Sequence, residues 1–291
     1  MSSIGRRLTR SRVGDGDKPA KPFDRPRFLH VLMGLFLLWT FAPIAIVVLF
    51  SFNSGKSLQN FEGFSTQWYS DFFGDQQLRD SLVASLEIAL VTMVVATLLG
   101  SLLAFGLVRS RNRLSPVTNV MMLIPLVVPE IVAGVTALLL FTQIGMKLSL
   151  TTIILAHITF SISYVTVIVR GRLAALNREV EEAAMDLGAT RFQTLRLVLL
   201  PALWPAILAA GLLTFALSFD DFVLSFFTTG EEVQPLPVRI YSSIRFGVTP
   251  TINAIGTLML LVSVSTIALA LALPRILGRR GQTVLIGKDA V

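Results

Sequence analysis

The stretch SLVASLEIALVTMVVATLLGSLLAFGLV, residues 81–108, decides the fold class, because Glu87 is its only charged side chain. A helix needs about 20 apolar residues to cross the hydrocarbon core of a bilayer. Five more stretches of this kind follow or precede it, at residues 28–50, 117–141, 148–169, 197–219 and 252–273. Unpaired backbone groups are too costly in lipid, and these stretches are too long for barrel strands. The sequence predicts an all-α, polytopic membrane protein with six transmembrane helices.

Composition supports the same class. The 291 residues are 53% hydrophobic and 15% charged, with a mean hydropathy of +0.72, whereas soluble domains are about 45–50% apolar and about a quarter charged. Cysteine is absent, which excludes disulfides and thiolate chemistry. The two histidines, His30 and His157, are far apart in sequence, which argues against a histidine metal centre. No loop carries a nucleophile beside a base, so we expect no enzyme.

The distribution of basic residues predicts the orientation. Of 25 Lys and Arg, 20 fall in the N-terminal tail, the loops after the second and fourth spans, and the C-terminal end. The positive-inside rule then places both termini in the cytoplasm. The net charge of +7 is therefore a topology signal, and no nucleic-acid partner is expected. We predict a cytoplasmic tail at residues 1–27, a transmembrane domain at 28–276, and a cytoplasmic tail at 277–291.

One short motif resembles part of a nucleotide-binding site, but the full pattern is not present. Gly55, Lys56 and Ser57 match the end of a phosphate-binding loop, but the glycine required five positions before Gly55 is Phe50. The segment is predicted to be a turn on the outer side. No other stretch resembles a nucleotide site, so we expect no cofactor in this chain, and any ATP and Mg²⁺ would be bound by a partner.

The loop at residues 177–201, NREVEEAAMDLGATRFQTLRLVLLP, is predicted to form two short helices. Asn177 is a good N-cap, and Gly188 is a typical helix stop. Thr190 can cap the second helix. The apolar residues of the first helix share one face and are Val180, Ala183, Ala184 and Leu187. From the residues alone this face either docks on another protein or packs on its own bundle.

The same loop resembles the EAA signature of ABC-importer permeases. That signature reads EAA, three residues, Gly, nine residues, an aliphatic residue, any residue and Leu-Pro. The matching residues here are Glu182, Ala183, Ala184, Gly188, Val198, Leu200 and Pro201. In this family the loop couples to an ATPase. The resemblance therefore implies an elbow that partner ATPases grip, within a type I ABC importer permease fold.

Other stretches extend the resemblance over most of the chain. They are PEIVAGVTALLLF from Pro129, HITFSISYVTV from His157, LSFDDFVLSFFTTG from Leu217 and LPVRIYSSIRFGVTPTINA from Leu236. Within the family they are most similar to the second permease subunit of spermidine/putrescine importers. That resemblance implies a polyamine cargo, an ABC ATPase dimer, a second permease subunit, an extracytoplasmic binding protein, and the inner (plasma) membrane of a prokaryote.

Ionisable residues in the spans are candidate pathway residues, because each costs at least about 2.5–3.5 kcal/mol at the bilayer centre. Glu130 follows Pro129 in mid-span, where prolines free backbone carbonyls that usually face a cavity. Asp220 and Asp221 end the fifth span, where together they would attract a multiply charged cation. Each of these residues also has a structural interpretation. Glu130 could be paired within the bundle, the two aspartates could simply lie at the membrane interface, and Glu87 could extend its carboxylate toward that interface. For His157 we favour the structural interpretation, a histidine packed in the core.

Two other functions fit the residues less well. One is an importer of another small solute, since acidic residues argue only mildly against anionic cargo. The other is a stand-alone secondary transporter or channel, for which the EAA elbow would have no purpose.

Overall fold

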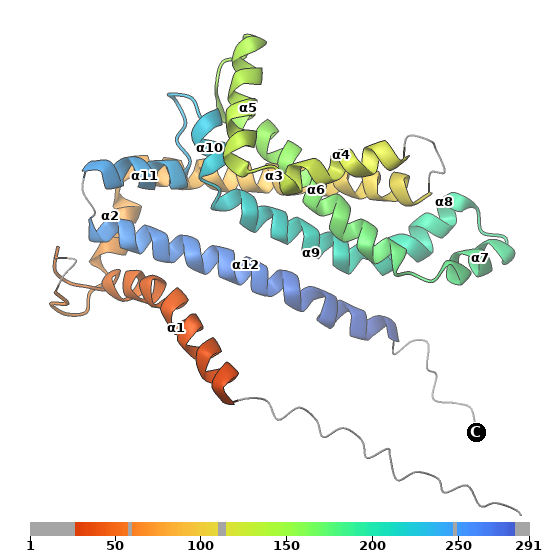
Figure 1. Ribbon diagram of the computed structural model, residues 1–291, viewed down its shortest axis with the longest axis horizontal. Coiled ribbons are helices and arrows are strands. Elements are labelled where there is room, and N and C mark those ends of the chain that lie inside the picture. Colours follow the sequence, from red (N-terminus) through yellow and green to blue (C-terminus); the bar gives the residue numbers. More distant parts are fainter. Residues whose placement is uncertain (1–26, 58–59, 110–114, 247–248, 283–291) are drawn as a thin grey trace, which may run out of the picture. The chain divides into compact units, whose positions relative to one another are not determined.

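The structure is a computed structural model that describes residues 27–57, 60–109, 115–246 and 249–282. The chain divides into two units, Met1–Ile46 and Val47–Val291. In the described residues the elements are α-helices and one π-helical turn (Figure 1). In order they are α1 (Arg27–Phe50), α2 (Gln67–Gly74), α3 (Gln76–Arg109), α4 (Ser115–Val127), α5 (Glu130–Gln143), α6 (Leu150–Ala174), α7 (Arg178–Asp186), α8 (Arg191–Thr194), η1 (Leu195–Leu199), α9 (Leu200–Phe219), α10 (Val223–Thr228), α11 (Leu236–Phe246) and α12 (Pro250–Gln282).

Among the described residues, five helical segments are long and apolar enough to cross a membrane. They are Phe28–Phe50, Gln76–Val108, Leu150–Ala174, the segment Arg191–Phe219 and Pro250–Leu273. These correspond to five of the six predicted spans. Helix α12 continues to Gln282, past the predicted end of the transmembrane domain at residue 276. The predicted N-terminal tail up to residue 26 and the last part of the C-terminal tail, from residue 283, lie outside the described residues.

The predicted third span, residues 117–141, differs from a simple helix. It consists of α4 and α5, which meet at Val128 and Pro129 with a bend of 109°. The physical reason is Pro129, which lacks an N–H and fixes its own φ at −54°. The residue before a proline also avoids helical backbone angles. Counted with this bent pair, the described part of the chain has up to six segments whose length and composition suit a membrane span.

Within the second unit, α3, α6, α9 and α12 lie side by side along the long direction of the view (Figure 1). Small residues on α3 allow α6 to approach closely, as they commonly do between membrane helices. A Cβ added to Gly100 would lie 2.7 Å from the side chain of Val165. The neighbouring positions Ala96 and Ala104, one turn before and after, are both fully buried.

Two apolar clusters hold the second unit together. The first joins α3, α6, η1 and α9 and consists of Ala104, Val165, Val169, Leu173, Leu199, Leu203, Ile207 and Ala210. The second joins α2, α3, α9, α11 and α12 and consists of Phe72, Ala89, Phe219, Leu236, Ile255 and Met259. Helix α5 packs mainly on α10, where Gly134 faces Phe227. The first cluster thus supports the elbow end of α9, and the second supports the end from which Asp220 and Asp221 follow.

Candidate functional site

A cavity of about 280 Å³ lies between α4, α5, α6, α9 and α10. Three of the predicted pathway residues, Glu130, His157 and Asp221, contribute to its wall. The rest of the wall is formed by Pro125, Leu126, Val128, Phe160, Ser161, Tyr164, Leu217, Ser218 and Leu224. No Lys or Arg of the described residues lines it. The structure therefore brings together carboxylates that are 91 residues apart in sequence, in a space whose charged side chains are anionic.

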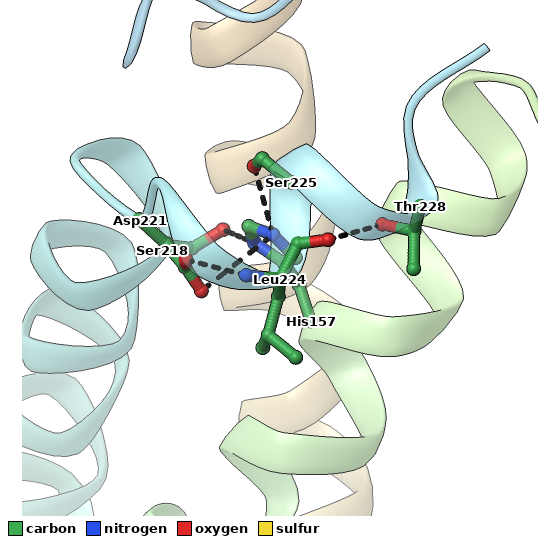
Figure 2. Close-up of polar contacts among 6 residues, drawn as sticks. All are labelled: His157, Ser218, Asp221, Leu224, Ser225 and Thr228. Carbon is green, nitrogen blue, oxygen red and sulfur yellow. Dashed lines mark hydrogen bonds and ion pairs between the residues drawn. The ribbon is translucent and has the colours of Figure 1, made fainter. Parts of the chain in front are cut away.

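Buried hydrogen bonds through His157 hold three helices together at this cavity (Figure 2). The His157 side chain on α6 is 1% exposed. Its Nδ1 lies 2.7 Å from the hydroxyl oxygen of Ser218 on α9, and its Nε2 lies 3.2 Å from that of Ser225 on α10. The same Nε2 is 3.8 Å from an oxygen of Asp221. This geometry supports the structural interpretation of His157, since both ring nitrogens have hydroxyl partners.

Asp221 is fixed by the start of α10 (Figure 2). Its Oδ1 accepts a hydrogen bond of 3.0 Å from the backbone N–H of Leu224. Its Oδ2 faces the imidazole ring of His157. The neighbouring residue Asp220 points elsewhere, since its Oδ2 accepts a hydrogen bond of 3.3 Å from the Ser263 hydroxyl on α12. The two adjacent aspartates therefore contact different helices, which the sequence did not indicate.

Glu130 stands at the first position of α5, directly after the bend. A carboxylate there is favoured by the partial positive charge of the helix N-terminus. It lies close enough to Asp220 and Asp221 to interact with both electrostatically. Three carboxylates in mutual repulsion provide an electrostatic attraction for a cation that carries more than one charge.

The remaining pathway candidate, Glu87, does not line this cavity, and its side chain is exposed on α3. Sequence reasoning missed Ser218 and Ser225, which contact His157, and it gave no role to Phe160. A signal was available for α6, because His157, Phe160, Ser161 and Tyr164 recur at intervals of three and four residues. That spacing places them on one face of a helix.

The elbow that precedes α9 follows the predicted caps closely. The side chain of Asn177 accepts a hydrogen bond from the N–H of Glu179, and α7 begins there. At its end, Gly188 has φ +88°, and the N–H groups of Gly188 and Ala189 bond to the carbonyls of Met185 and Ala184. This pattern is a Schellman motif, which favours glycine at the left-handed position. Thr190 then caps α8 in a reciprocal capping box with Gln193.

The apolar face of α7 is turned away from the rest of the second unit. Val180 is 55% exposed and Leu187 is 91% exposed, while Ala183 is also exposed. A different face carries Glu181, which is 6% exposed and lines a second cavity together with Phe105. Of the two interpretations open from the sequence, the free apolar face is the one that the structure shows.

The elbow joins α9 through the π-helical turn η1. Its defining hydrogen bond runs from the N–H of Leu200 to the carbonyl of Leu195, five residues earlier. Pro201, the next residue, has no N–H to donate to the carbonyl of Leu197, and its ring would clash with that carbonyl in a regular helix. A wider turn before Pro201 relieves this clash. Leu200 and Pro201, the Leu-Pro pair of the EAA pattern, thus lie where the elbow meets α9.

These features define a multi-pass transport protein of the membrane, and the family comparison agrees. The family described as "Binding-protein-dependent transport system inner membrane component" matches residues 96–281. The chain belongs to this family. The match includes the broken span, all cavity-lining residues and the elbow.

Individual relatives place the chain within the family. It is 39% identical over 225 residues to the spermidine/putrescine transport system permease protein PotC of Escherichia coli (strain K12), covering 77% of this chain and 85% of that protein. It is also 39% identical over 246 residues to the putrescine transport system permease protein PotI of the same strain, covering 82% of this chain and 88% of the relative.

Solved structures confirm the fold. A bacterial ABC transporter involved in the import of the acidic polysaccharide alginate matches with a TM-score of 0.68 at 13% identity, covering 88% of this chain and 96% of that chain. An amino acid ABC transporter matches with a TM-score of 0.58 at 19% identity, covering 72% and 97%. The chain has the type I ABC importer permease fold, as predicted.

Proposed function

We propose that this chain is one permease subunit of an ATP-driven importer and forms part of the pathway for polyamines such as spermidine and putrescine. The observation that carries this proposal is the cavity lined by Glu130 and Asp221, with Asp220 close by, in a chain 39% identical to permease subunits named for these two solutes. Polyamines carry several ammonium groups, and carboxylates are their natural partners. An extracytoplasmic binding protein would deliver the cargo.

The driving force would come from a partner ATPase dimer that binds ATP and Mg²⁺ and grips the elbow. The exposed face of α7 supports this part of the proposal. An apolar helix face left open between two spans fits a groove on another protein. The coupling residues would be those of the EAA pattern: Glu182, Ala183, Ala184, Gly188, Leu200 and Pro201.

Transport would follow alternating access. Closure of the ATPases would move α7 and α8, and the cavity would change from inward to outward opening. Shifting such an equilibrium from 1:99 to 99:1 takes about 5.5 kcal/mol of differential binding. A second permease subunit would supply the other half of the pathway. The charge distribution supports cytoplasmic termini for this chain in the inner (plasma) membrane of a prokaryote.

The test is uptake of labelled spermidine, putrescine and an anionic solute into proteoliposomes that contain the complete importer with its binding protein. Glu130→Gln and Asp221→Asn remove one negative charge each from the cavity. A charged hydrogen bond contributes about 1.5–3 kcal/mol, so we expect initial polyamine uptake to fall by about tenfold or more in each variant.

Asp71→Asn provides the matched control, because Asp71 is an exposed residue of α2 that lies outside the cavity wall. Its uptake should equal that of the wild type. Polyamine uptake that is unchanged in both cavity variants would remove the carboxylates from the pathway. Uptake of the anionic solute alone by the wild type would exclude the polyamine cargo altogether.

A further inference from the structure

The cavity has a second chemical character besides its carboxylates. Phe160 and Tyr164 stand one turn apart on α6 and both line it. Their ring centroids are 5.2 Å apart, with the planes at 53°. His157, one turn before Phe160 on the same face, is held by Ser218 and Ser225. Helix α6 thus presents a continuous face of rings to the space that Glu130 and Asp221 make anionic.

The Tyr164 ring is available to a ligand. It is only partly buried, and its hydroxyl has no hydrogen-bond partner among the described residues. Tyr241 provides a contrast within the same chain, because the guanidinium carbon of Arg245 lies 4.8 Å from the centroid of its ring. Tyr241 therefore already has a cation over its face, whereas no Lys or Arg of the described part of the chain lines the cavity around Tyr164.

Carboxylates alone do not distinguish an organic ammonium group from a metal cation. Ca²⁺ and Mg²⁺ require six or more oxygen ligands or retained waters, and an aromatic ring supplies none. An alkylammonium group, in contrast, is attracted to the negative face of a ring within about 6 Å of its centroid. Its methylene groups also gain contact with apolar side chains such as Leu217 and Leu224, which complete the wall.

We infer that Tyr164, supported by Phe160, is a specificity-determining residue that holds an ammonium group of the cargo by a cation–π contact while Glu130 and Asp221 neutralise its charge. The inference rests on the proposed polyamine function and adds residues to it. The cavity of about 280 Å³ is close to the lower limit of small-ligand sites, about 300 Å³, which suits a small organic cation.

The test uses the complete importer in proteoliposomes, with labelled spermidine and putrescine at saturating binding protein. Position 164 is changed to Phe, to Leu, and to phenylalanines with one, two and three ring fluorines. Fluorine withdraws electron density from the ring face at nearly constant shape, and a purely structural ring tolerates it. Tyr164→Phe should keep uptake within about twofold, Tyr164→Leu should lose about tenfold, and uptake should fall stepwise with each fluorine.

The same fluorine series at Phe215 is the control. Phe215 stacks on Phe219 at 5.7 Å, belongs to the packing around the second apolar cluster, and does not line the cavity. That series should leave uptake unchanged. The fluorinated variants preserve ring shape, so they decide the question even if Tyr164→Leu fails to assemble.

Two results overturn the assignment, and they differ from each other. A flat fluorine series at position 164, with normal wild-type polyamine uptake, removes the cation–π contact and leaves the proposed function in place. Absence of spermidine and putrescine uptake by the wild-type importer overturns the proposed function and this assignment together.

Discussion

At the scale of single residues, His157 shows how a polar side chain is accommodated in a membrane span. A buried polar group without a partner costs about 1–3 kcal/mol, and both ring nitrogens avoid this through Ser218 and Ser225. These contacts tie α6 to the end of α9 and to α10, and so they position Asp221. His157 thus serves the site by holding its wall together.

His157→Leu should lower the stability of the purified complex, because it leaves two buried hydroxyls without their partner. We expect a loss of about 1–3 kcal/mol, measured as a lower midpoint of thermal unfolding in detergent. Ser225→Ala removes only the longer contact of 3.2 Å and should cost about 1 kcal/mol or less. Equal midpoints for His157→Leu and the wild type would show that the contacts contribute nothing to stability.

At the scale of elements, the elbow turns one side toward the second unit and leaves another side exposed. Glu181 faces the second unit's own residues, while Val180 and Leu187 are exposed. The Schellman motif at Gly188 fixes where α7 stops, and the capping box at Thr190 fixes where α8 starts. Because both helix ends are fixed by these hydrogen bonds, the elbow can be displaced as a unit without loss of its helical structure.

Leu187→Glu should weaken attachment of the partner ATPase and leave the fold intact, since a side chain that is 91% exposed contributes little to folding. Burying a leucine at an interface contributes about 1.5–3 kcal/mol, so the affinity should fall by at least tenfold. The measurement is co-purification of the ATPase with the tagged permease. Arg178→Gln, which changes the net charge equally at another exposed position of α7, is the control and should retain the ATPase. Full retention by Leu187→Glu would contradict the elbow's proposed role.

At the scale of the second unit, close contact between α3 and α6 supports both the cavity and the elbow, because α6 carries one wall of the cavity and leads into α7. The contact depends on Gly100, where a Cβ would lie 2.7 Å from Val165 and 3.0 Å from the carbonyl oxygen of Ile162. The hydroxyl of Thr166 also donates to the carbonyl of Gly100, at 3.2 Å.

Gly100→Ala should destabilise the whole bundle by about 1–3 kcal/mol, as overpacking of a tight contact commonly does. Gly106→Ala on the same helix is the matched control, because nothing lies within 4 Å of a Cβ built there. That control should be neutral or slightly stabilising. Thermal unfolding of the two purified complexes tests the pair, and identical midpoints would show that the α3–α6 contact adjusts without cost.

The features that could be predicted from the sequence are those that depend on local chemistry. Span length follows from apolar composition, and the elbow follows from Asn177, Gly188 and Thr190, which act on their own backbone. The break at Pro129 also has a local cause, although the sequence analysis predicted one continuous span there. The different partners of Asp220 and Asp221 were not predictable, because they depend on packing between distant helices. That Glu130 and Asp221 line the same cavity could not be predicted either, because they are far apart in sequence and only the fold brings them together.

The break between α4 and α5 also places the start of a helix at the wall of the cavity. Helix α5 starts at Glu130, and its N-cap, Pro129, makes no side-chain hydrogen bond to the backbone, so the first N–H groups of α5 need another hydrogen-bond acceptor. Only water or a neighbouring polypeptide can satisfy them. Lipid offers no such partner, so this helix start is better suited to the wall of a water-accessible cavity, where Glu130 lies, than to a surface that faces the bilayer.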